Sequence, residues 1–152
     1  FVVDSRNSRV QKFTKHGVHL GGWGTAGVGD GDFDRPWGIC VDKDGFVYVA
    51  DWGNERVQVL EPDGGFIQKL RGESRLSRWA EDFFESSPHE KESRDMADLE
   101  PELTVDVTTP YEESARTERF FWGPVSVKLD AAGRLYVTET NRHRIQVYVP
   151  AS

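Results

Sequence analysis

The chain has 152 residues, of which 37% are hydrophobic and 30% are charged, and its net charge is −7. The length suits one domain, and no apolar run approaches the ~18 residues of a membrane-spanning helix. Cys40 is the only cysteine, which excludes a disulfide framework. The negative charge argues against a generic binder of nucleic acid or of anionic membranes.

The sequence contains three copies of one unit. Residues 33–60 recur 88 positions later as residues 121–148, and the segment 1–13 resembles the same unit 47 positions earlier. The 88-residue offset aligns identical residues at Phe33/Phe121, Pro36/Pro124, Asp42/Asp130, Gly45/Gly133, Tyr48/Tyr136, Val49/Val137, Arg56/Arg144, Gln58/Gln146 and Val59/Val147. The 47-residue offset aligns Asp4/Asp51, Asn7/Asn54, Arg9/Arg56, Val10/Val57, Gln11/Gln58 and Gly17/Gly64. This recurrence predicts a repeat protein whose units stack on one another.

The first copy begins Phe-Val-Val-Asp, without an initiator methionine and in the middle of a strand-like pattern. We therefore expect the chain to belong to a longer polypeptide, with the opening strands of this copy missing. The following segment, Gly22–Gly27, fits the dinucleotide-binding pattern G-x-G-x-x-G. That mechanism needs a helix to begin at this point, and none is predicted, so we interpret the segment as a loop between copies.

Asp30, Asp32 and Asp34 alternate as the first ligands of a calcium-binding loop do. Such a loop needs glycine at its sixth position and glutamate at its twelfth, and this sequence has Arg35 and Val41 there. A turn rich in glycine and aspartate explains the same residues, and a bound cation is the alternative.

The second copy is complete. Short runs of β-branched and aromatic residues predict four strands, at 39–41, 47–49, 57–60 and 66–70. Asp42–Gly45 predicts a hairpin turn, and Asp51–Glu55 predicts a second sharp reversal. One such antiparallel sheet has two apolar faces and cannot bury both of them alone.

Residues 73–119 differ from the rest. They hold 14 acidic and 6 basic residues and no glycine, whereas the remaining residues are nearly neutral and hold all 15 glycines. This break predicts an insertion, 73–119, between the segment 1–72, which holds the end of one repeat unit plus one full unit, and a further, incomplete unit at 120–152.

The insertion contains one apolar stripe at helical spacing. We expect a helix that is capped by Ser74 and ends before Pro88. Two interpretations remain open: the stripe packs on the chain's own sheets, which we favour, or it docks a partner protein. The candidate partner-binding residues are Leu76, Trp79, Phe83 and Phe84.

The repeats resemble the NHL family of β-propellers. The second copy carries the matching elements, which are Phe33, Pro36–Ile39, Asp42, Gly45, Tyr48–Asp51 and Asn54–Val59. The resemblance implies an all-β fold of four-stranded blades, part of a six-bladed ring. The third copy departs from the pattern at Ser126, Glu139 and Arg142, which we expect to weaken its turn while leaving a Glu139–Arg144 pair possible.

Other polar residues receive structural interpretations. His16 and His19 have a spacing that could bind zinc, but no further ligand lies nearby in the sequence. Cys40 lies in an apolar strand, where a buried thiol is inert. The acid–arginine pair occurs in every copy, which favours a structural charge pair over a catalytic one.

We therefore expect a non-catalytic propeller scaffold that binds proteins, without cofactor, metal, nucleic acid or membrane span. The alternative is a metal-dependent six-bladed propeller enzyme of the lactonase or lyase type, which the resemblance also allows. Converging His and Asp side chains in a central channel would distinguish the enzyme.

Overall fold

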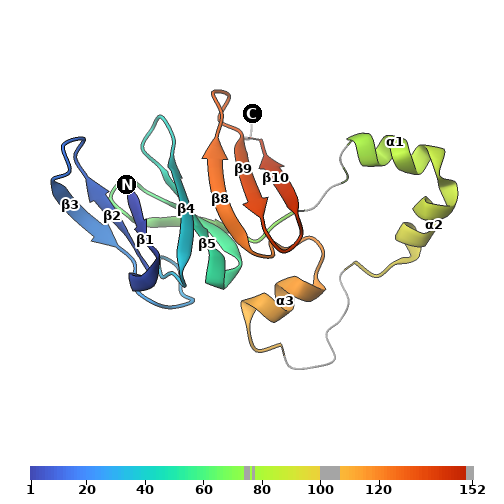
Figure 1. Ribbon diagram of the computed structural model, residues 1–152, viewed down its shortest axis with the longest axis horizontal. Helices are drawn as coiled ribbons and strands as arrows, with labels where there is room; N and C mark the ends of the chain where they lie inside the picture. Colours follow the sequence, from blue (N-terminus) through green and yellow to red (C-terminus); the bar gives the residue numbers. More distant parts are fainter. Residues whose placement is uncertain (74–75, 77, 100–106, 150–152) are drawn as a thin grey trace.

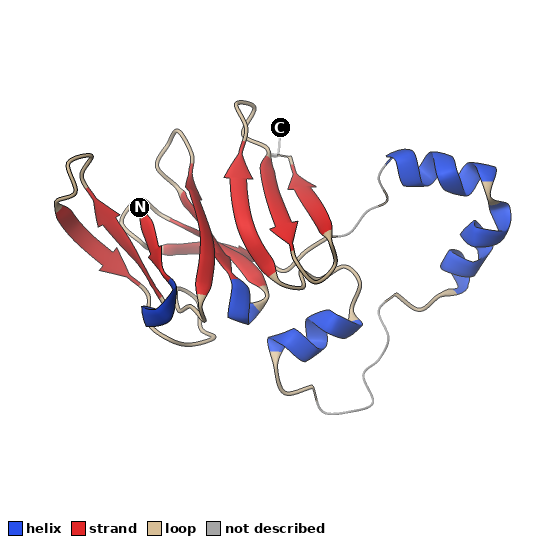
Figure 2. Cartoon of the chain, in the orientation of Figure 1, coloured by secondary structure: helices blue, strands red, loops and turns tan. Residues whose placement is uncertain are grey.

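The computed structural model describes residues 1–73, 76, 78–99 and 107–149. Three separate antiparallel sheets stand side by side, and the helices lie outside them (Figures 1 and 2). The strands are β1 (Val2–Asp4), β2 (Arg9–Phe13), β3 (His19–Trp23), β4 (Pro36–Val41), β5 (Val47–Asp51), β6 (Arg56–Leu60), β7 (Phe66–Leu70), β8 (Pro124–Leu129), β9 (Leu135–Glu139) and β10 (Arg144–Tyr148).

The central sheet is a complete blade with the order β4-β5-β6-β7. Its first hairpin closes as the sequence predicts, because Asp42 Oδ1 accepts hydrogen bonds from the backbone N–H groups of Asp44 and Phe46, both over 2.9 Å. Gly45 follows at φ +93°, a conformation that favours glycine. The turn is therefore fixed by one carboxylate and one glycine.

The outer two sheets are the same blade with a strand missing. In the first sheet, β1, β2 and β3 lie 47 residues before β5, β6 and β7, so only the opening strand is absent. In the third sheet, β8, β9 and β10 lie 88 residues after β4, β5 and β6, and no described residue forms a counterpart of β7. The predicted propeller-type fold is confirmed, and in the complete copy each of the four predicted strands is present.

The core lies between the sheets rather than within any one of them. One buried cluster joins the first and second sheets and consists of Val10, Phe33, Val47, Val49 and Leu60. Another joins the second and third sheets and consists of Ala50, Val57, Phe121, Val127, Leu135 and Val137. Every residue of the central strand β6 is buried, because this blade has a neighbour on both faces.

In its described residues the insertion forms three short helices: α1 (Arg78–Ser86), α2 (Pro88–Met96) and α3 (Pro110–Arg116). Only the first is predicted by the apolar stripe, and its proposed cap, Ser74, lies outside the described residues. The other two begin with proline at the first helical position, where its missing N–H costs nothing. Within the part of the chain that the structure describes, every helix is too short and too polar to cross a bilayer.

Candidate functional site

Each blade contains a carboxylate that gathers the polar side chains of its last turn, and it is buried in the second and third blades (Asp51 and Glu139) and partly exposed in the first (Asp4). In the second blade, Asp51 Oδ2 accepts hydrogen bonds from Arg56 Nε over 2.8 Å, Asn54 Nδ2 over 2.9 Å and Gln58 Nε2 over 3.2 Å. Asp4 has the same set of partners in the first blade, namely Asn7, Arg9 and Gln11. A group repeated in all blades serves the blade rather than a reaction.

These networks also fasten the chain segment that enters each blade. Arg56 donates from its guanidinium to the carbonyl oxygens of Val28, Gly29 and Asp32, at 2.7–2.9 Å. In the third blade, Arg144 Nε lies 2.6 Å from Glu139, and Arg144 Nη2 donates to the Phe120 carbonyl over 2.8 Å. The predicted Glu139–Arg144 pair is thus formed, and it holds the end of the insertion.

The insertion replaces a short loop without displacing the blades. Between the first two blades, Phe33 N–H donates to Thr25 O over 2.8 Å, and between the next two, Phe121 N–H donates to Arg71 O over 2.7 Å. A backbone hydrogen bond from the corresponding phenylalanine thus closes a short loop between the first two blades and closes the base of the insertion between the next two. Gly72 makes this approach possible, since a Cβ there would overlap the Arg119 carbonyl oxygen.

Arg142 anchors α3 to the third blade. Its Nη2 donates to the carbonyl oxygens of Ser114 (2.6 Å) and Thr117 (2.8 Å), at the end of α3. The equivalent residue of the second blade, Asn54, makes one such bond, to Gly27 O over 2.8 Å. That Arg142 weakens the turn stays a prediction, and the structure adds that its longer side chain reaches the helix that stands in place of the short loop.

The third blade keeps the left-handed residue of this turn, but 140–142 do not form the 3-10 helix that the other two blades have at Ser5–Asn7 and Trp52–Asn54. Ser8, Glu55 and His143 occupy the same place in their copies, and all three adopt the left-handed conformation with φ of 50–52°. Glu55 is 1% exposed and accepts a hydrogen bond from Gly123 N–H over 2.5 Å. Burial raises its pKa to about 7. Sequence analysis missed Glu55, since no pattern marks a glutamate at this position as buried.

The candidate partner-binding residues do not lie on the blades. α1 packs against α2, and the two stand beyond the outer strand β10 in Figure 1. Trp79 is 78% exposed and stacks on Phe83, itself 45% exposed, with 6.3 Å between ring centroids. Leu76 is also exposed. The favoured interpretation, in which the whole stripe packs on the chain's own sheets, is therefore wrong.

Phe84 differs from the rest of the stripe because it faces α2. It is half-buried, contacts the edge of Phe83, and lies under the Arg94 guanidinium at 6.0 Å. Arg94 also pairs with Glu118 over 3.1 Å, which ties α2 to the segment that enters the third blade. The structure thus divides the stripe into an inward residue, Phe84, and an outward pair, Trp79 and Phe83.

A second acid–arginine pair fixes the base of the insertion. Arg71, at the end of the second blade, pairs with Glu113 of α3 over 2.7 Å and lies over the Phe120 ring at 4.6 Å. Together with Arg142, this pair holds α3 from both neighbouring blades. The insertion is therefore mounted on the blades through α3, while α1 and α2 project from them.

The other sequence motifs lie apart and already have partners. Gly22–Gly27 runs from the end of β3 into a loop, and no helix begins there. Asp30 pairs with Lys69 over 2.7 Å, Asp32 accepts a hydrogen bond from Thr25, and Asp34 pairs with Arg35 over 2.9 Å. In the described ranges, no three His, Cys, Asp or Glu side chains are placed to share a metal ion.

The two remaining candidates show no catalytic arrangement. His19 contacts the Phe13 ring at 5.2 Å, and both His16 and His19 are exposed. Burial raises the pKa of the Cys40 thiol to about 11, so that the thiol stays protonated at neutral pH.

Comparison with known proteins agrees with this architecture. The family model described as "NHL repeat" matches residues 33–60 and 121–148. Protein lin-41 of Caenorhabditis elegans is 57% identical over 47 residues, which are 31% of this chain and 4% of that protein. E3 ubiquitin-protein ligase TRIM71 of Mus musculus is 49% identical over 55 residues, which are 35% of this chain and 6% of that protein.

A longer match is found with NHL repeat-containing protein 3 of Homo sapiens, which is 33% identical over 91 residues, or 58% of this chain and 24% of that protein. The chain therefore spans less than a quarter of the length of each of these relatives. The chain thus carries two NHL repeats, at 33–60 and 121–148, and its side-by-side antiparallel sheets have the arrangement of propeller blades.

Proposed function

We propose that this chain is a non-catalytic scaffold that binds a partner protein through its helical insertion. The blades, 1–72 and 120–152, form the rigid mount, and the segment 73–119 carries the binding surface. The observation that supports the proposal most directly is the exposed Trp79–Phe83 stack on α1. This helix packs against α2, and the insertion that contains both is held to the blades through α3. Exposed aromatic side chains of this size cost free energy in water unless a partner covers them.

The residue types support the same proposal. Tryptophan is among the residues that dominate protein–protein interfaces, because it buries a large area with little loss of conformational entropy. The mount also favours binding, since the Arg142 and Arg71 contacts hold α3 before any partner arrives. TRIM71 is named as a ubiquitin ligase, an activity that requires recognition of another protein.

The experiment is affinity purification of the protein as it occurs in its own cells, with partners quantified by mass spectrometry. The Trp79→Ala/Phe83→Ala variant is compared with the wild type and with Trp37→Ala, a matched control at an exposed tryptophan of β4. We expect partners that are lost in the double variant and kept in the control. An unchanged set of partners would refute the proposal.

We propose no second function. The metal-dependent enzyme would need converging ligands, and the described residues contain no such group of three. The absence of nucleic-acid binding stays a prediction, which retention of RNA at low salt by the purified protein would contradict.

A further inference from the structure

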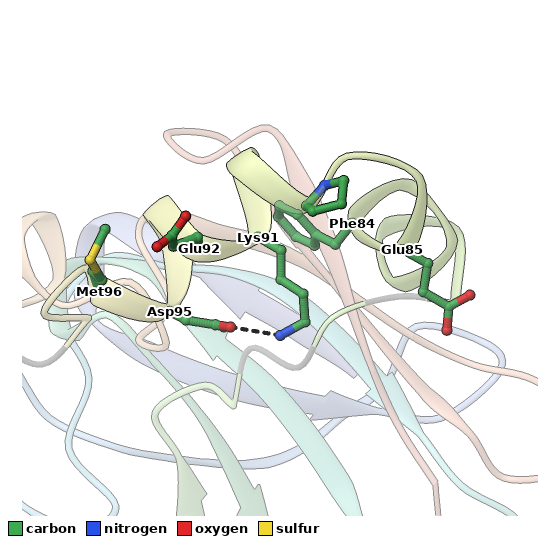
Figure 3. A pocket seen from close by; sticks show the side chains of 7 residues that line it. Phe84, Glu85, Lys91, Glu92, Asp95 and Met96 are labelled. Carbon is green, nitrogen blue, oxygen red and sulfur yellow. Dashed lines mark hydrogen bonds and ion pairs between the residues drawn. The ribbon is translucent and has the colours of Figure 1, made fainter.

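A shallow groove lies at the corner between α1 and α2 (Figure 3). Neither Trp79 nor Phe83 lines it. Its volume is about 400 Å³, and its lining residues are Phe84, Glu85, Pro88, Lys91, Glu92, Asp95 and Met96. The groove thus combines three apolar side chains with four charged ones, three of them acidic.

The apolar part of the groove suits apolar side chains of a partner. Phe84 is fixed against Phe83 and Arg94, while Met96 is 74% exposed. Methionine is flexible and polarisable, so it adapts to apolar groups of different shape. The fixed aromatic ring and the adaptable thioether lie toward opposite ends of the groove, and each offers an apolar contact to a partner's side chains.

The charged part of the groove is unbalanced. Lys91 lies within it, but its ammonium is held by Asp95 over 2.6 Å, as the dashed line in Figure 3 shows. Neither Glu85 nor Glu92 has a cationic partner among the described residues. An acidic or wholly apolar partner would desolvate these carboxylates without compensation, whereas Lys or Arg side chains would neutralise them.

We infer that the groove binds a basic amphipathic segment of a partner protein, in which Lys or Arg residues flank apolar anchors. The inference rests on the proposed function and names the chemistry of the partner. The charge of the whole insertion agrees with it, because 73–119 holds 14 acidic residues against 6 basic ones. α2 is nine residues long, about 13.5 Å, so the segment needs about two and a half helical turns to follow it.

The test uses two synthetic peptides of about 12 residues, both with leucine at i, i+4 and i+7. One peptide carries lysine at the other positions and the other carries glutamate. Binding of each labelled peptide to the intact protein is measured by fluorescence anisotropy at low and at physiological salt. We expect the lysine peptide to bind, more weakly as salt rises, and the glutamate peptide not to bind.

Two variants assign the binding to the groove. Glu85→Lys/Glu92→Lys should weaken binding of the lysine peptide at least tenfold, whereas Asp44→Lys/Glu61→Lys, an equal charge change at exposed positions of the second blade, should weaken it less than threefold. Met96→Ser keeps every charge and should also weaken binding several-fold. Circular dichroism confirms that each variant is folded.

Equal loss in the two charge variants, or no effect of Met96→Ser, would overturn the inference by showing that the peptide binds to overall charge alone. Binding of the glutamate peptide would overturn it as well. The outcome is separable from that of the proposed function. If Trp79→Ala/Phe83→Ala loses partners but neither peptide binds, the proposed scaffold function stands and the groove inference fails. If the lysine peptide binds but the partners are unchanged, the groove inference stands and the proposed function fails.

Discussion

Glu55 reports on the contact between the second and third blades, because its carboxyl group is buried where they meet. Burial raises its pKa from 4.5 to about 7. The hydrogen bond from Gly123 N–H opposes this rise, the negative charge of Glu139 adds to it, and the positive charges of Arg71 and Arg142 oppose it. Replacing Glu55 with glutamine removes the titration and leaves an amide oxygen that can accept from Gly123 N–H.

The magnitude follows from the difference between the folded and unfolded pKa values. A rise from 4.5 to about 7 corresponds to about 3 kcal/mol. Between these two pH values the folded state binds more protons than the unfolded state, so the free energy of unfolding falls as the pH rises. The contribution of Glu55 is complete below about pH 4.5 and is lost above about pH 7. The Glu55→Gln variant should therefore match the wild type at pH 4.5 and exceed its stability by up to about 3 kcal/mol at pH 8.

Urea unfolding, followed by tryptophan fluorescence from pH 4.5 to pH 8, measures this difference. Burial also raises the pKa of Asp51, but Asp51 titrates in both proteins and cancels in the comparison. A difference between variant and wild type that does not change with pH would show that Glu55 is not buried between the blades. A difference that grows toward acid pH would refute the reasoning outright.

Three further predictions concern the core and the insertion. Arg142→Asn should remove both bonds to the end of α3 and speed amide hydrogen exchange in 110–117 by at least tenfold, with exchange in β6 unchanged; equal exchange in α3 would contradict the anchor. Val57→Ala, in a fully buried position, should cost about 2 kcal/mol, whereas Val147→Ala, half-exposed, should cost less than about 0.5 kcal/mol; equal costs in denaturant unfolding would contradict the packing between blades. Replacing 72–120 with the loop 26–32 should leave the circular dichroism of the strands unchanged and abolish partner binding; loss of the strand signal would show that the blades need the insertion.

The repeat pattern predicted most of the blades. Its offsets carried each strand of the complete copy onto its counterpart, so that β5 predicts both β1 and β9. The reason is physical: the same turn residues and the same alternation of buried positions produce the same pleated sheet. The first copy has counterparts of β5, β6 and β7 but none of the opening strand β4.

The insertion could not be predicted in the same way, because it has no second copy to compare with. Pro88 was expected to end a helix, and it does, but it also occupies the first position of α2. Trp79 and Phe84 follow one apolar stripe in the sequence, yet α2 covers only Phe84. Whether a stripe is covered depends on the tertiary position of its neighbours, which spacing along the chain does not contain.

The role of Arg142 also depends on a tertiary contact that the repeat pattern does not contain. Compared with Asn54, it is a departure from the repeat, and a local view of the turn treats it as a defect. Its bonds to Ser114 and Thr117 exist only because α3 lies between the second and third blades, where the first and second blades have only a short loop. A residue that departs from the repeat in the copy next to an insertion therefore indicates a contact between that residue and the insertion.

The claim that the insertion is the binding element, and the blades its mount, is tested most directly by photocrosslinking in the native cell. A photoreactive phenylalanine analogue is introduced at position 79 in one sample and at position 37 in another, both exposed tryptophans in the wild type. The account predicts a crosslinked partner protein at position 79 and none at position 37. Crosslinks at position 37 alone would place the partner on the blades and contradict the account.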